Sequence, residues 1–123
     1  MAKDDYDVLV FKILTYLYAC FKRKCSFEQV IFYKTLLPED IAPEYLTDIL
    51  RYMCDEGYIT GLRFVRAWGG EYALANDPED MRITPAGIHY LKDNSKMQKI
   101  KDAILDAAPG MLAELVKLAF PVK

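Results

Sequence analysis

The hydrophobic pattern of this chain changes its period at Gly57, and this change restricts the possible folds more than any other feature. Upstream of Gly57 the apolar residues recur at helical spacing. Residues 58–68 are instead rich in β-branched and aromatic residues, which is typical of a strand. Gly69-Gly70 then predicts a hairpin turn, and residues 71–74 form the returning strand. We therefore expect one β-hairpin inserted between helical segments.

Three helices are predicted before the hairpin, over residues 5–23, 26–36 and 43–56. The first carries two apolar stripes, so it should lie at the centre of the fold or be covered by a partner, because a surface helix needs one stripe. The second begins with Ser26 and Gln29, whose spacing matches a capping box. In the third, Pro43 suits the first helical position, and Gly57 ends the helix.

The chain becomes helical again after the hairpin. A polar loop covers residues 76–80, and Thr84-Pro85 then places a good N-cap before a good first helical residue. A last helix should begin near Lys96. Pro109-Gly110 should break it and leave a short amphipathic piece over residues 111–120.

Three helices, a two-stranded hairpin and further helices follow the order of a winged helix-turn-helix. We therefore predict an α+β fold, mostly helical, in which the second and third helices form the helix-turn-helix and the hairpin is the wing. Residues 1–95 would form the winged-helix domain, and residues 96–123 a C-terminal helical extension that packs on this domain or on a partner. The predicted core contains Leu9, Ile13, Leu17, Val30, Leu46, Leu50, Met53, Ile59, Ile83 and Leu91.

Two segments resemble winged-helix regulators in detail. Residues 50–59 resemble the end of a recognition helix, and residues 83–91 resemble the Leu-Thr-x-x-Gly-x-x-Tyr-Leu segment of the same proteins. With Tyr72-Ala73-Leu74 and Asn94-Ser95, they make the chain similar to the YjcQ-like family, small winged-helix proteins of Gram-positive bacteria and their phages. The resemblance spans roughly residues 6–105 and implies a winged-helix fold and a transcriptional regulator of phage origin. The acidic loop at residues 76–80 departs from the family's pattern, so pairing of residues 81–83 with the wing is not assumed.

Composition indicates one intracellular domain. The chain has 123 residues, of which 53% are hydrophobic, and its formal net charge is −2. This charge excludes a globally basic nucleic-acid binder but leaves room for a locally basic face. Three cysteines, an odd number, favour a reducing compartment, so we expect a cytoplasmic protein. The most apolar stretch, residues 8–21, is shorter than a bilayer requires, and no membrane association is expected.

The residue types that catalysis requires are scarce, so we expect neither an enzyme nor a bound cofactor or metal. His89 is the only histidine, and we interpret it as structural. Cys20 and Cys25 do not have zinc-finger spacing. Cys20 and Cys54 are interpreted as core residues, and a functional thiol at Cys25 is the less favoured alternative. No small-molecule substrate is indicated.

Duplex DNA is the partner that a winged helix most often binds, but the charge pattern here is mixed. Residues 38–57 contain six acidic residues and one basic residue, which opposes entry of the third helix into a groove. Basic residues instead occupy the turn after the first helix and the wing. The residues that we assign to a DNA interface are Lys22, Arg23, Lys24, Arg51, Tyr52, Arg63, Arg66 and Trp68. A protein-interaction or assembly module that does not bind DNA is the alternative.

A homodimer is also expected, because the first and last helices offer more apolar surface than a small core needs. The residues that we assign to dimerisation are Phe11, Leu14, Tyr18, Leu112, Leu115, Val116 and Ala119. The alternative is that the two apolar surfaces cover each other within one chain.

Overall fold

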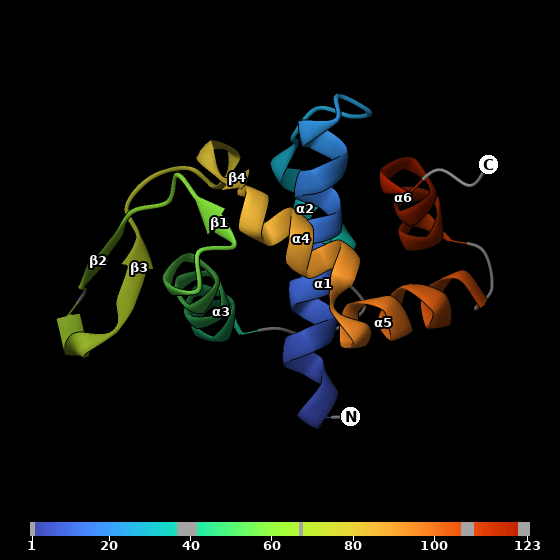
Figure 1. Cartoon of the computed structure of the whole chain (residues 1–123). Helices are drawn as coiled ribbons and strands as arrows, with labels where there is room; N and C mark the ends of the chain where they lie inside the picture. The colour runs from blue at the N-terminus through green and yellow to red at the C-terminus, as the bar shows by residue number, and fades with distance from the viewer. Residues whose placement is uncertain (1, 37–41, 67, 107–109, 121–123) are drawn as a thin grey trace.

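The computed structural model describes residues 2–36, 42–66, 68–106 and 110–120. Six helices are assigned within these ranges, together with four short strands that pair two by two (Figure 1). The elements are α1 (Ala2–Phe21), α2 (Gln29–Leu36), α3 (Pro43–Asp55), β1 (Ile59–Thr60), β2 (Phe64–Arg66), the 3-10 turn η1 (Trp68–Gly70), β3 (Tyr72–Leu74), the 3-10 turn η2 (Pro78–Asp80), β4 (Arg82–Ile83), α4 (Pro85–Asp93), α5 (Ser95–Asp106) and α6 (Met111–Ala119). This arrangement confirms the predicted fold class.

Helix α1 is the centre of the fold, as its two apolar stripes predict. Helices α2 to α6 all contact it, and Figure 1 shows α1 standing between the wing side of the molecule and α6. Leu9, Ile13 and Leu17 are buried in the core. Even the polar residues Lys12 and Thr15 of this helix are buried, so the middle of α1 is covered on every side.

The strand predicted over residues 58–68 is divided into two. β1 pairs antiparallel with β4, in the register Ile59↔Ile83, whereas β2 pairs with β3 to form the wing. Gly61 lies between β1 and β2 with a φ of +95°. A Cβ atom at this position would lie 2.2 Å from the Asp80 carbonyl oxygen, so only glycine allows the chain to leave the first pair and enter the wing.

The end of α3 and the start of α4 are joined by backbone caps that the sequence predicts. Gly57 has a φ of +83°, its N–H donates to the Cys54 carbonyl, and the Tyr58 N–H donates to the Met53 carbonyl at 2.9 Å. These two bonds form a Schellman motif. Thr84 caps α4 by accepting a bond from the Gly87 N–H at 3.0 Å, and its hydroxyl donates to the Gly57 carbonyl. Thr84 therefore also attaches α4 to the end of α3.

Two predictions for the second helix are wrong. The helix begins at Gln29 rather than Ser26, so no capping box starts at Ser26. The hydroxyl of Tyr16 on α1 accepts the Glu28 N–H at 2.9 Å, and this bond holds the preceding segment outside the helix. Val30, predicted in the core, is 65% exposed, because the shifted helix buries Phe32 instead. Of the other predicted core residues, Leu46 is half-buried and the rest are buried.

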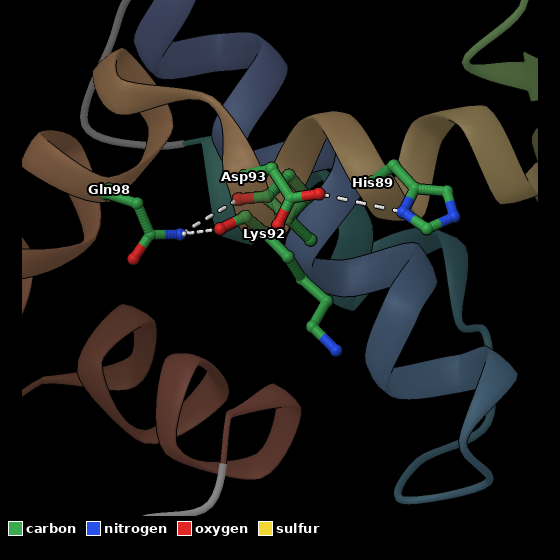
Figure 2. A network of polar contacts seen from close by, with 5 residues as sticks. His89, Lys92, Asp93 and Gln98 are labelled. Atoms are coloured by element: carbon green, nitrogen blue, oxygen red, sulfur yellow. Dashed lines mark hydrogen bonds and ion pairs between the residues drawn. The ribbon is translucent and has the colours of Figure 1, made fainter.

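Asn94 and Gln98 form the junction between α4 and α5 without a loop. The Asn94 side-chain oxygen accepts the backbone N–H groups of Lys96 and Met97, at 2.9 and 3.2 Å, and so caps α5. The Gln98 amide donates to the Lys92 carbonyl at 2.6 Å and to the Leu91 carbonyl at 3.3 Å, which satisfies the end of α4 (Figure 2). This sharp turn brings α5, and after it α6, back against α1.

Candidate nucleic-acid interface

The wing is a short hairpin whose base is closed by the Asn76 side chain together with a backbone bond from the Ala75 N–H to the Arg63 carbonyl. β2 and β3 pair in the register Phe64↔Leu74, Val65↔Ala73 and Arg66↔Tyr72. Beyond the Phe64↔Leu74 pair, the Asn76 side chain accepts the Arg63 N–H at 2.8 Å and donates to the Gly61 carbonyl at 2.8 Å. Asn76 therefore fixes the point where the wing leaves the body of the protein, a role that the sequence analysis did not assign.

The tip of the wing presents a large aromatic side chain to solvent. Trp68 is 100% exposed, and it begins the 3-10 turn that Gly69 and Gly70 complete with φ values of +88° and +85°. Arg66 stabilises this turn, because its Nε donates to the Gly70 carbonyl at 3.2 Å. Arg63 and Arg66 are both exposed. The structure thus presents the three predicted wing residues on the outside of the hairpin.

Arg51, the only basic residue of α3, is engaged with the wing. Its guanidinium lies 3.7 Å from the centroid of the Tyr72 ring, and the Arg66 guanidinium lies over the same ring at 5.5 Å. Arg51 also lies 3.9 Å from Asp48, and its side chain is 26% exposed. Its first role is therefore to hold α3 and β3 together, which limits its reach toward a base.

The outer face of α3 is acidic, as the sequence predicts. Glu44, Asp48, Asp55 and Glu56 are exposed along the helix and its C-cap. Tyr52, assigned to the DNA interface, is 53% exposed on this face. The inner face buries Ile49, Leu50 and Met53. The helix thus buries one apolar face and presents an acidic face to solvent.

The basic turn after α1 has a divided role. Lys22 donates from Nζ to the Ala119 carbonyl at 2.9 Å and lies over the Tyr18 ring, so it caps the C-terminus of α6. Arg23 has a φ of +62° and is exposed, as is Lys24. Arg23 and Lys24 line a groove of about 710 Å³.

Arg82 lies on the same groove, and the sequence analysis missed it. Its side chain is exposed on β4 and donates to the carbonyls of Glu79 and Met81 at 3.2 Å. The alternation of buried Met81, exposed Arg82 and buried Ile83 could have predicted its exposure, but not its proximity to Arg23. Figure 1 shows the turn after α1 well away from the wing, so the predicted basic residues form two separate surfaces.

The residues assigned to dimerisation are used inside the chain. Phe11, Leu14 and Tyr18 on α1 are buried, as are Leu115, Val116 and Ala119 on α6. The two helices pack against each other, and the Phe120 ring lies 5.7 Å from the Tyr18 ring. The side chain of Leu112 is outside those that the structure describes. The two apolar surfaces therefore cover each other, which is the alternative arrangement; the oligomeric state itself stays a prediction.

The reactive groups considered in the sequence do not converge on one site. His89 is exposed on α4, where it pairs with Asp93 at 3.6 Å (Figure 2). Cys20 and Cys25 are half-buried with their sulfur atoms 3.6 Å apart, and burial, together with the bond to Cys25, raises the pKa of Cys20 to about 12. Cys54 is half-buried on α3. Over the described ranges, no three potential ligands among His, Cys, Asp and Glu form a metal-binding group.

None of the helices in the described part of the chain has the length and apolar character needed to cross a membrane.

Comparison with known proteins identifies the family. Neither the curated proteins nor the solved structures contain a match to the chain. The family model described as YjcQ protein matches residues 11–106, a span that runs from the middle of α1 through the wing to the end of α5. Because this match covers most of the chain, the protein belongs to the YjcQ family.

Proposed function

We propose that this protein is a non-catalytic, cytoplasmic transcriptional regulator that binds duplex DNA through its wing. The observation that carries the proposal is the wing, which exposes Trp68 and Arg66 at its tip and Arg63 at its base. Arginines of this kind contact phosphates, which supply most of the non-specific affinity of DNA-binding proteins. The winged-helix order of the elements supports the same class of partner.

The charge of α3 determines how the duplex would lie. Four exposed carboxylates follow the helix from Glu44 to Glu56, and its one arginine is stacked on Tyr72. Phosphates within a Debye length, about 10 Å at moderate salt, would repel this face. β3 packs along α3, and the tip of the wing is the outer end of the hairpin in Figure 1, so we place the duplex on the wing tip rather than on the acidic face of α3.

Fluorescence gives a direct test, because Trp68 is the only tryptophan of the chain. Titration with random-sequence duplex DNA should change the emission of Trp68, and the affinity should fall as salt rises from about 50 to 200 mM. Arg63→Ala and Arg66→Ala should each weaken binding about equally for all sequences. Each should also reduce the salt slope by about 0.9 for every phosphate that the arginine neutralises. Lys99→Ala, an exposed lysine on α5, is the matched control and should leave both quantities unchanged.

The alternative function is a protein-interaction module that does not bind DNA. The acidic face of α3 favours it, since Asp48, Asp55 and Glu56 lie around the exposed Tyr52 without a free basic neighbour on that helix. Such a face suits a basic protein partner. Absence of any binding to duplex DNA at about 50 mM salt would reject the wing proposal in favour of this alternative.

A further inference from the structure

A pocket lies where the start of α1, the end of α3, the chain before β1 and the middle of α4 meet. Its volume is about 430 Å³, and its described lining consists of four tyrosines and two carboxylates: Tyr6, Tyr52, Tyr58, Tyr90, Asp55 and Glu56. No basic side chain is among these lining residues. It is separate from both basic surfaces, and neither the wing nor the turn after α1 contributes to it.

Three of the four tyrosine rings that line the pocket are held in place by packing against other side chains. Tyr58 and Tyr90 stack with their centroids 4.3 Å apart and their planes at 19°. Both rings, with Tyr6, are half-buried and pack on the hydrophobic core. Tyr52 is more exposed and belongs to the outer face of α3. The pocket is therefore lined by three rings that the core holds in place, Tyr6, Tyr58 and Tyr90, and by the Tyr52 ring at its solvent-exposed edge.

The pocket is electronegative for two independent reasons. The face of an aromatic ring carries negative electrostatic potential, which attracts cations. Asp55 and Glu56 add carboxylates at the end of α3, where the helix dipole is also negative. The pKa of Tyr90 is raised, mainly by burial and to a smaller extent by its neighbours Tyr58, Asp7 and Glu56. This direction fits a site that disfavours further negative charge. Asp7, a further acidic side chain whose charge acts on Tyr6 and Tyr90, is paired with Lys96 at 3.3 Å.

We propose that this pocket binds the quaternary ammonium group of a small organic cation. A quaternary ammonium group matches the lining because the aromatic faces can replace its weak hydration, whereas a primary ammonium group would lose a much stronger hydration shell on entering. The volume is sufficient for such a group together with a short substituent. A bound cation would also offset part of the negative charge on the outer face of α3. The proposal does not depend on DNA binding by the wing.

The test compares three small molecules by nuclear magnetic resonance titration of the full chain. Choline is the probe, 3,3-dimethylbutan-1-ol is its uncharged isostere, and butylammonium is a primary ammonium cation. We expect choline to bind about tenfold more tightly than the isostere and more tightly than butylammonium. The ring signals of Tyr52, Tyr58 and Tyr90 should shift. Equal binding of the isostere would overturn the proposal, as would tighter binding of butylammonium.

Two variants locate the site. Tyr52→Leu and Glu56→Gln change exposed lining residues and should each weaken choline binding several-fold while the chain stays folded. Tyr45→Leu removes an exposed tyrosine of α3 that does not line the pocket, so it should bind choline like the unmodified chain. Loss of binding in Tyr45→Leu, or unchanged binding in both pocket variants, would show that choline binds elsewhere and would overturn the assignment.

Discussion

The Arg51 guanidinium lies over the Tyr72 ring, with its central carbon 3.7 Å from the ring centroid, and this contact joins α3 directly to the wing. A residue that the sequence suggests as a reader of bases is thus first a structural link. At the base of the wing, Asn76 bonds to both Arg63 and Gly61, and Phe64 and Leu74 pack on the hydrophobic core. The position of the wing relative to α3 therefore depends on the Arg51–Tyr72 contact together with this packing.

Replacing Arg51 with alanine should loosen the wing. Without the guanidinium on the Tyr72 ring, the free energy of unfolding should fall by about 1 kcal/mol, the usual size of a partly exposed cation–π interaction. Amide hydrogen exchange should become faster in residues 64–66 and 72–74. Arg63→Ala, which removes a wing arginine with no ring contact assigned to it, is the control. Unchanged exchange in the wing of Arg51→Ala would show that the stacking on Tyr72 does not hold it.

Leu50 and Val30 test the placement of the helix-turn-helix. Leu50 is buried on the inner face of α3, so Leu50→Ala should lower the free energy of unfolding by about 2–5 kcal/mol. Val30 is exposed on α2, so Val30→Ala should change it by less than about 0.5 kcal/mol. Urea unfolding measures both. A large decrease in Val30→Ala would mean that α2 begins near Ser26 after all and that Val30 faces the core.

Helix α6 determines the oligomeric state that we expect. Because α6 covers α1 within the same chain, the protein should sediment as a monomer near 14.2 kDa. Deletion of residues 110–123 should uncover apolar side chains such as Tyr18, lower the stability and cause self-association. The opposite pattern, a dimer that becomes a monomer on deletion, would show that α6 pairs two copies, as the sequence analysis suggested.

Cys20 should be an unreactive thiol. With its pKa raised to about 12, Cys20 carries almost no thiolate at neutral pH, so iodoacetamide should label it far more slowly in the native chain than in urea. Because the pKa of Cys20 is higher in the folded than in the unfolded chain, its neutral thiol contributes fully to the free energy of unfolding below the ordinary thiol pKa. This contribution is lost as the pH rises toward about 12. Stability should therefore fall in this alkaline range. Peptide mass spectrometry resolves the labelled sites, and equal rates in native and unfolded protein would contradict the prediction.

The sequence by itself determined the order of helices and hairpin, because helical and strand periods are local properties of the pattern of apolar residues. It also determined the caps at Gly57 and Thr84, since a positive φ favours glycine and an N-cap favours a hydroxyl within one turn of the chain.

Only the tertiary structure decided which distant side chains meet. The Tyr16 hydroxyl binds the Glu28 N–H across 12 positions and moves the start of α2, which no local pattern in residues 26–36 can reveal. Arg51 meets Tyr72, and Tyr58 stacks on Tyr90, because packing against α1 places α3, the wing and α4 next to one another. The physical reason is that such contacts depend on how whole elements pack, whereas periodicity reports only which face of each element is apolar.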